Sequence, residues 1–539
     1  MVPARAAAPD AALFSVMQKE MGRSLERLKT GSFGPPYFIA YRLVTRRVLS
    51  LTASFGGIER RESRQWSTLY VEVRYGSRRF DNTDMSFQGW QGAGSLDPEV
   101  LREKLWWLTD KAYKEAVSGY LRKKADRATE FLEDEPDDFS VEAPTQAVSG
   151  EGSFVPDEPR ARRLIAALSA LLKAYPYVYS GTATLSLGLG RRYLVTSEGT
   201  RLATPAERLP DLLSVHAFTR AKDGMGLDDF RSWVFDGMGG LPPLKALKAA
   251  VRDMARELGR ERRAPLQAPA AAPAVLDPEF SGVLFHEALG HKLEGQRQRD
   301  PRQGQIFKNL VGKRIIPPFL SVFDDPTLPS FGGEPLHGAY SFDSEGVPAR
   351  AVTLVDHGVL RHFLMSRWPI KGFPFSNGHG RSDDHRRPTG RMAVLIVRAD
   401  RPKPVKFLFK ELRRRIKEEG KPYGFYLDGS FGGDNPTERS QAQTLQVKPR
   451  LLYRIYPDGR RELVRGASMV GTPLAVLNEI VAAGTDEALS NAYFCGAESG
   501  FIPVSQIAPS LLLSTIELQR LPERRESLPV LPSPFKGRQ

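Results

Sequence analysis

A change in sequence character near residue 265 is the feature that most restricts the fold. Before it, helix-like and strand-like segments are mixed without the regular strand–helix alternation of a parallel α/β sheet. At the change lies RAPLQAPAAAPAVLDPEF, a stretch rich in alanine and proline that is typical of a linker. After it, one helix is followed by strands punctuated by glycine. We therefore expect an α+β protein, with a mixed α/β domain over residues 1–264 and a β-rich, barrel-like domain over residues 265–520.

Apolar periodicity locates the helices and the irregular segments. Apolar residues at helical spacing predict helices over residues 11–30, 98–131, 241–262, 403–419 and 472–483. Residues 131–160 are acidic and carry several prolines, which predicts an exposed loop. The tail, residues 521–539, is rich in proline and is expected to be loosely held.

Cysteine content and hydropathy bear on the compartment. The chain has one cysteine, Cys495, so it can form no disulfide within itself, which fits a reducing compartment. No run of about 18 apolar residues occurs, so no membrane span is expected. The N-terminus lacks the apolar core of a signal peptide. A cytoplasmic protein is the expectation, unless a leader has been removed from the N-terminus.

The net charge of +14 raises the question of an acidic partner. A basic protein attracts nucleic acids and anionic surfaces. Here the excess is spread along the chain, and its densest cluster, residues 410–421, alternates with glutamates as solvated helix faces do. No zinc-finger, RRM or helix-turn-helix pattern appears. The sequence therefore gives little reason to expect a nucleic-acid partner.

The segment SGVLFHEALGHKLEGQ places His286, Glu287 and His291 within six positions. Zinc peptidases of the HExxH type carry histidines four residues apart, on one helix face. Histidines five apart point about 140° away from each other on a regular helix. A π-bulge would return them to one face, and Gly290 permits a bulge or a helix end. The alternative is that both histidines cap or line a core while Glu287 faces solvent.

A catalytic zinc ion usually has three protein ligands, so a third is needed. Cys495 is the only thiol, and it lies far downstream in a segment rich in glycine and proline. Two histidines and a cysteine form an acceptable zinc set. Spacing this long does not show that they meet, and a buried, inert cysteine is the alternative.

Several segments, in order, resemble the TldD/PmbA metallopeptidase family, once called modulators of DNA gyrase. They include VLDPEFSGVLFHEALGHKLEG, GFYLDGSFGGDNPTERSQ and FCGAESGFIPVSQIAPSLLL. The resemblance covers residues 270–517 well and is weaker in the N-terminal half. It departs after the cysteine, where the family's C-G-K-x-G-Q reads Cys-Gly-Ala-Glu-Ser-Gly, which leaves substrate preference and partner choice open.

The resemblance implies a zinc-dependent peptidase of the catalytic, TldD-like branch. His286, His291 and Cys495 would bind Zn²⁺, and Glu287 would be the general base that activates the zinc-bound water. The PmbA/TldE-like branch lacks the metal motif, whereas all four residues are present here. The family also implies a dimer, either a homodimer or a heterodimer with a PmbA/TldE-like paralogue.

The substrate expectation is a short or unfolded peptide, bound in an extended form along a sheet edge. Gly432 and Gly433 would let the backbone approach such a peptide closely, while His379 and Arg381 in NGHGRS are further candidate contacts. Two rival readings remain: a non-catalytic binding or scaffold paralogue, and a nucleic-acid-associated regulator, which would bind DNA in a salt-dependent way. Cleavage specificity does not follow from the sequence.

Overall fold

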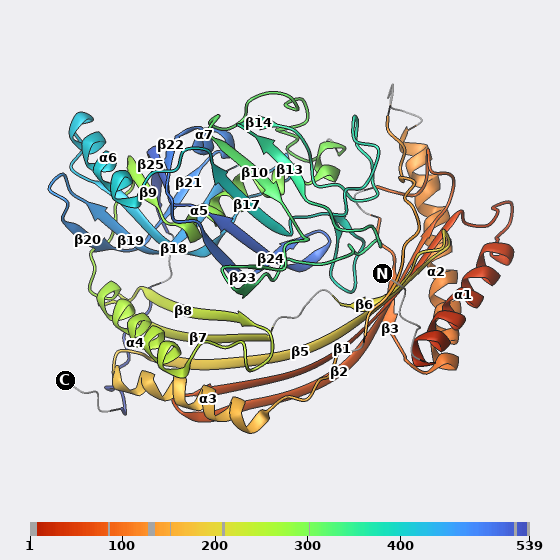
Figure 1. The fold of residues 1–539 in the computed structure, drawn as a ribbon, viewed down its shortest axis with the longest axis horizontal. Coiled ribbons are helices and arrows are strands. Elements are labelled where there is room, and N and C mark those ends of the chain that lie inside the picture. Colours follow the sequence, from red (N-terminus) through yellow and green to blue (C-terminus); the bar gives the residue numbers. More distant parts are fainter. Residues whose placement is uncertain are drawn as a thin grey trace.

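The structure is a computed structural model that describes residues 8–84, 87–127, 135–150, 152–206, 211–300, 302–442, 444–521 and 525–535. A long curved sheet forms the N-terminal part, and the C-terminal part lies on its concave side (Figure 1). Helices and sheets are segregated rather than alternating, so the α+β expectation is confirmed. None of the helices in these ranges is both long and apolar enough to cross a membrane.

The N-terminal sheet has the strand order β3-β2-β1-β5-β6-β4, with β7 paired to β5 and β8 paired to β7. Its strands are β1 (Phe38–Ser54), β2 (Gly57–Arg74), β3 (Trp90–Ala93), β4 (Gln146–Val148), β5 (Ser180–Thr196), β6 (Arg201–Pro205), β7 (Asp211–Arg220) and β8 (Gly226–Phe235). The sheet is antiparallel apart from the β4–β6 pair. Strict alternation over such long strands gives the sheet two distinct faces.

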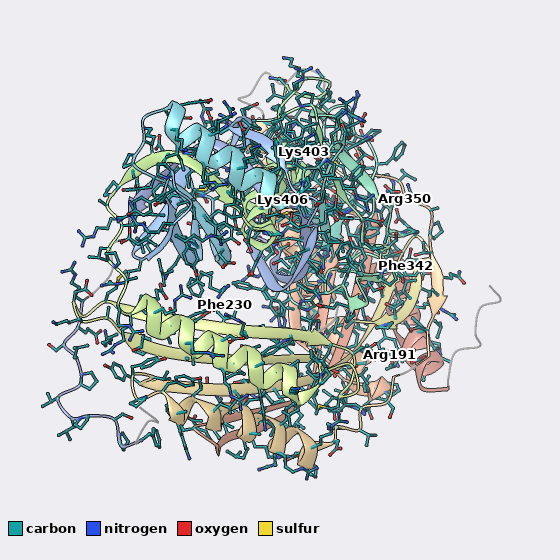
Figure 2. All side chains as sticks on the ribbon, turned by 60° about the vertical axis from the view of Figure 1, so that its left-hand side comes forward. Arg191, Phe230, Phe342, Arg350, Lys403 and Lys406 are labelled. Atoms are coloured by element: carbon teal, nitrogen blue, oxygen red, sulfur yellow. The ribbon has the colours of Figure 1, made fainter. Side chains whose placement is uncertain are left out.

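One face of this sheet is covered by four helices in two pairs. They are α1 (Ala8–Arg27), α2 (Pro98–Arg127), α3 (Glu158–Ala170) and α4 (Leu244–Glu261). Leu43 of β1 packs with α1 and α2, whereas Leu49 and Leu51 pack with α3 and α4. The other face looks toward the C-terminal domain, and Phe230 of β8 lies between the two (Figure 2).

The C-terminal domain contains a closed five-stranded barrel, because β18 pairs with both β9 and β19 in the order β18-β9-β25-β21-β19. This sheet comprises β9 (Ala270–Leu276), β18 (Gly424–Asp434), β19 (Leu445–Ile455), β20 (Arg461–Val464), β21 (Ala467–Gly471), β22 (Ile480–Ala483) and β25 (Leu511–Arg520). The expected β-rich, barrel-like domain is therefore present. Its helix α6 (Val405–Glu418) packs outside β9 and β25.

A second, six-stranded sheet stands beside the barrel in the order β14-β13-β10-β17-β24-β23. Its strands are β10 (Leu320–Asp324), β13 (Val352–Asp356), β14 (Val359–Leu360), β17 (Val394–Ala399), β23 (Ala488–Ala497) and β24 (Gly500–Ala508). Two ribbons complete the domain: β11 (Ser330–Phe331) with β12 (Glu334–Pro335), and β15 (Gly380–Arg381) with β16 (Thr389–Gly390). Helix α5 (Pro278–Phe285) is buried between the barrel and this sheet.

Three expectations about local structure need correction. The helix expected over residues 472–483 ends at Asn478 as α7 (Pro473–Asn478), because the β-branched pair Ile480-Val481 enters strand β22. The acidic segment is not an exposed loop throughout, since Asp138 and Phe139 are almost fully buried. In the tail, Phe535 packs against Phe55 of the N-terminal part, with ring centroids 4.8 Å apart.

Candidate metal centre

The HE segment leaves α5 through a π-helical turn, His286–Gly290. The backbone N–H of His291 donates to the carbonyl of His286, five residues earlier. This pairing inserts the extra residue that the histidine spacing requires. The two imidazole rings are perpendicular, with centroids 4.9 Å apart. A Cβ at Gly290 would lie 1.9 Å from the sulfur of Met392, so a larger residue here would displace that side chain.

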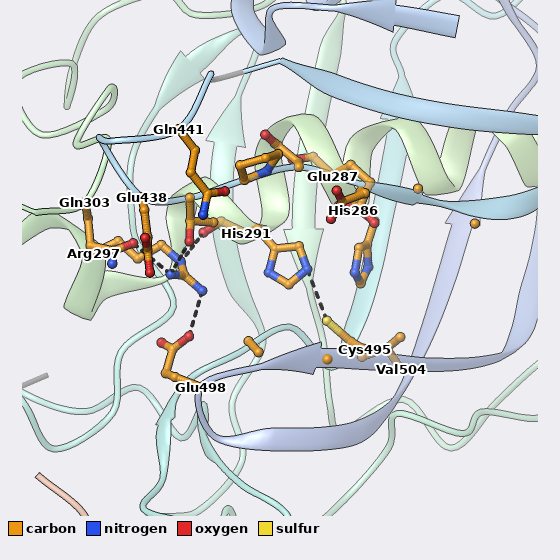
Figure 3. Close-up of a pocket in the computed structure, with 18 of the residues that line it drawn as sticks. His286, Glu287, His291, Arg297, Gln303, Glu438, Gln441, Cys495, Glu498 and Val504 are labelled. Atoms are coloured by element: carbon orange, nitrogen blue, oxygen red, sulfur yellow. Dashed lines mark hydrogen bonds and ion pairs between the residues drawn. The ribbon is translucent and has the colours of Figure 1, made fainter. Parts of the chain in front are cut away.

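Cys495 completes the cluster from a different part of the chain. It lies on β23, and its Sγ is 3.3 Å from Nε2 of His291 (Figure 3). One ligand atom each from His286, His291 and Cys495 lies within 4.8 Å of the others, and all three residues are buried. The sequence identified these three residues as candidate ligands, but it did not predict that Cys495 lies next to the two histidines.

Neighbouring polar groups orient both imidazoles. Nδ1 of His291 pairs with Oε1 of Glu294 at 2.9 Å, which leaves Nε2 facing the cluster. Gln506 on β24 lies 3.0 Å from Nδ1 of His286, and its amide oxygen is otherwise buried without a partner. This contact occupies Nδ1 of His286 and leaves Nε2 as the nitrogen available to a metal. Metal-binding histidines are held in this way.

The charges around Cys495 favour a thiolate. Burial alone would raise the pKa of this thiol, but the positive charges of His291 and Arg391 hold it well below its usual range. Arg391 is fully buried and donates from Nη2 to both the sulfur, at 3.1 Å, and the carbonyl of Cys495, at 2.8 Å. The thiolate is the form that binds metals.

Glu294 is the anionic centre of this network. Burial alone would raise the pKa of its carboxyl, but Arg297 and His291 outweigh burial and lower it to about 2. Arg297 also contacts Glu498 at 3.0 Å, beyond the metal ligands. The ligands are thus held by a buried set of alternating charges, and the donor set of two imidazoles and one thiolate fits zinc.

Glu287 lies beside the ligands without belonging to their set. Its side chain is 8% exposed, and burial raises the pKa of its carboxyl even though His286 and His291 act in the opposite direction. A Cβ at Gly433 would come within 2.5 Å of Cγ of Glu287, so glycine there leaves room for the carboxylate. The side-chain amide of Asn435 donates to the backbone carbonyl of Glu287 and fixes the turn.

The cluster opens into a cavity of about 1190 Å³. Residues of β18 and its following loop, including Gly432 and Gly433, form one wall. The β23–β24 hairpin forms the other wall through residues 494–498, Val504 and Gln506. β23 is the terminal strand of its sheet, so one backbone edge is not paired within the described parts of the chain.

His379 and Arg381 do not border this cavity. Both are completely buried: His379 contacts Asp324 at 3.2 Å, and Arg381 donates to the carbonyl of Pro503 at 2.9 Å. The structure gives them internal contacts instead of the substrate contacts considered from the sequence. The polar residues that do support the site, Glu294, Gln506 and Arg391, were not expected. Only Glu294 carried a signal, because it follows His291 by three residues.

The residue that begins α5 makes stability depend on pH. Asp277 caps the helix by accepting from the N–H of Phe280 at 2.8 Å, and burial raises the pKa of its carboxyl to about 7. Its pKa in the unfolded chain is about 3.9, so the folded state binds more protons and loses stability as the pH rises between these values. Asp277→Asn keeps the cap without the charge. At about pH 8 we expect the Asn variant to unfold at a higher urea concentration than wild type, with a free energy of unfolding larger by on the order of 2–4 kcal/mol. At about pH 4 the variant and wild type should unfold at the same urea concentration. If Asp277→Asn and wild type have the same urea midpoint at about pH 8 as well as at about pH 4, the raised pKa of Asp277 is contradicted.

Comparison with known proteins assigns the C-terminal domain. The model of the PmbA/TldA metallopeptidase C-terminal domain matches residues 269–520. Residues 269–520 therefore form a domain of the TldD/PmbA metallopeptidase type. The matched region contains α5, the π-turn and the β23–β24 hairpin, and therefore all of the candidate ligands.

Individual members of the family agree with this assignment. A metalloprotease of Methanothermobacter thermautotrophicus is 32% identical over 237 residues, which make up 44% of this chain and 47% of that protein. A zinc metalloprotease TldD homolog of Saccharolobus solfataricus is 28% identical over 246 residues, 45% of this chain and 50% of that protein. The matched part thus spans about half the length of these curated relatives.

The likeness of the whole fold is broader. TldE from Thermococcus kodakarensis superposes with a TM-score of 0.61 at 14% identity, covering 94% of this chain and 100% of that one. At this identity the match shows a common fold. The curved N-terminal sheet, which the sequence comparisons leave out, thus belongs to the same architecture.

Proposed function

We propose that this protein is a zinc-dependent peptidase of the TldD-like branch. One observation carries the proposal: the ligand atoms of His286, His291 and Cys495 lie within 4.8 Å of one another in a large cavity, with Glu287 beside them. Zinc is favoured over harder divalent ions because the set contains a thiolate and no carboxylate. The relative from Saccharolobus solfataricus is named a zinc metalloprotease, which supports this choice.

When bound, zinc supplies Lewis acidity, which favours loss of a proton from water and polarises a peptide carbonyl. Glu287 accepts the proton of the attacking water at its carboxylate and later gives it to the departing amine. Glu294 and Gln506 hold the two imidazoles in the orientations that leave their other nitrogens free. Arg391 keeps the sulfur of Cys495 anionic.

The proposed substrate is a short or unfolded peptide in an extended conformation. The free edge of β23 offers backbone groups on one side of the cavity, and Gly432 and Gly433 present no side chains on the other. Pairing with a sheet edge uses the peptide backbone and tolerates many side chains. Backbone pairing also requires an unfolded segment, so folded proteins would be poor substrates.

We also propose that the chain acts as a dimer, either with itself or with a TldE-like paralogue. The common fold with TldE supports a partner of similar shape. Light scattering of the purified chain, alone and mixed with a co-expressed paralogue, separates the two alternatives. A monomer under both conditions argues against the dimer.

Zinc content tests the metal site directly. We expect about one zinc per chain in the wild type by elemental analysis, and a clear loss in Cys495→Ala and in His286→Ala, because two ligands hold zinc far less tightly than three. His379→Ala is the matched control, since it changes a buried histidine outside the cavity. Absence of zinc from the wild type after growth with added metal would refute the site and favour a scaffold role.

A further inference from the structure

The face of the N-terminal sheet that looks toward the C-terminal domain carries an array of hydroxyl groups. It occupies the half of the sheet whose other face is covered by α3 and α4. On β1, β5 and β7 its members alternate with buried residues, on β8 it contributes one serine, and each member is half-buried. This hydroxyl face consists of Ser50, Thr52, Ser54, Thr182, Thr184, Ser186, Ser214 and Ser232.

The hydroxyls form rows across the strands. Thr52 and Thr184 are 3.2 Å apart between their Oγ1 atoms, and Ser214 and Ser232 are 3.3 Å apart between their Oγ atoms. Thr184 and Ser214 are directly opposite in the β5–β7 register, so one row crosses four strands. A hydroxyl has one donor and two acceptor sites, so each pair keeps capacity for a further bond.

This composition differs from that of an ordinary solvated sheet. The solvated face of an antiparallel sheet is polar, and charged side chains are common on it. Here the charged groups flank the array: His216 and Asp228, 3.4 Å apart, border it on β7 and β8, while Arg60 and Glu62 lie on β2. The centre is left neutral, with groups that both donate and accept.

The hydroxyl face continues toward the metal cavity. Phe230 lies two residues before Ser232 on β8 and packs against Phe431 of β18, with ring centroids 5.8 Å apart. Phe431 directly precedes Gly432, which lines the cavity. The array and the cavity therefore lie on either side of this aromatic pair, which joins the two domains. Figure 2 labels Phe230 where the N-terminal sheet faces the C-terminal domain.

We infer that the hydroxyl face is a second binding surface for the polypeptide substrate, an inference that rests on the proposed peptidase function. It holds the part of an extended chain that lies outside the metal cavity. An extended backbone presents N–H and C=O groups at regular intervals, and neutral hydroxyls pair with both kinds regardless of sequence. Longer unfolded peptides then bind more tightly than short ones that fill only the cavity.

Peptide binding is best measured without turnover, on the Glu287→Gln protein loaded with zinc. The probes are two fluorescein-labelled peptides of Ala, Gln, Ser and Gly, about 6 and about 20 residues long, which extend to about 20 and 65 Å. Fluorescence anisotropy gives both dissociation constants. The double variant Thr52→Val/Thr184→Val removes two hydroxyls with little change of shape. The matched variant Thr52→Ser/Thr184→Ser keeps both hydroxyls. Ser118→Ala, on the exposed side of α2, removes a hydroxyl outside the array and is the control.

We expect the Val pair to weaken binding of the long peptide about tenfold and to leave the short peptide unchanged, with recovery in the Ser pair. Equal affinity of the long and short peptides for the parent protein, or equal affinity of the Val pair and the parent for the long peptide, overturns the inference. So does a dimer that dissociates in the Val pair, because a second copy then covers the face. If the wild type shows no turnover but these differences in binding remain, the peptidase function is contradicted and the binding surface is not.

Discussion

Glu287→Gln is expected to retain about one zinc per chain while its kcat for peptide hydrolysis falls by about 10² to 10⁴, the usual contribution of a general base. Glutamine keeps the shape of the side chain but cannot accept a proton at neutral pH. The ligand atoms of His286, His291 and Cys495 do not include this carboxylate, so binding of the metal should be unaffected. Elemental analysis and kcat on a mixed-peptide digest give the two readings from one sample.

The outcome separates three roles for Glu287. Loss of turnover with zinc retained identifies the base. Loss of zinc together with turnover shows that the carboxylate is needed to build the site, and full activity with zinc bound removes Glu287 from the mechanism. Glu418→Gln, which removes an exposed carboxylate on α6, controls for the change of charge and is expected to leave kcat within about threefold of wild type.

Features set by local sequence were predictable. The five-residue interval between His286 and His291 was compatible with an extra residue in the helix, and the structure contains that π-turn. Apolar periodicity located α2 and α6 closely. These features depend on neighbours in the chain, for which spacing and residue type carry the information.

Features set by distant contacts were not predictable from residues alone. Cys495 reaches His291 only because the β23–β24 hairpin lies against α5 and its π-turn, a contact between segments about 200 residues apart. His379 and Arg381 show the converse error. A glycine-rich loop with polar residues is typical of a binding site, but here the same side chains satisfy buried carbonyl and carboxylate groups.

Residues 135–142, which are part of the acidic segment, join the two parts of the protein. Phe139 lies between two guanidinium groups, with Cζ of Arg74 at 3.7 Å and Cζ of Arg367 at 3.9 Å from its ring centroid. Arg74 belongs to β2, whereas Arg367 belongs to the C-terminal domain. Asp138 makes a second bridge, because it pairs with Lys123 of α2 and with Arg299 two residues after Arg297. Composition indicated only an acidic loop, because the residues that contact Phe139 and Asp138 are distant in sequence.

Phe139→Ala is therefore expected to lower the free energy of unfolding by about 3–5 kcal/mol, the range for a buried Phe truncated to Ala. The cavity left behind also removes the surface on which both guanidiniums stack. Urea unfolding followed by tryptophan fluorescence measures the change. Phe139→Leu keeps most of the apolar volume, so its free energy of unfolding should lie between those of wild type and Phe139→Ala. Val141 is 62% exposed in the same segment, so Val141→Ala should stay within about 0.5 kcal/mol of wild type. If Phe139→Ala unfolds at the wild-type urea midpoint, the segment contacts the interface without stabilising it.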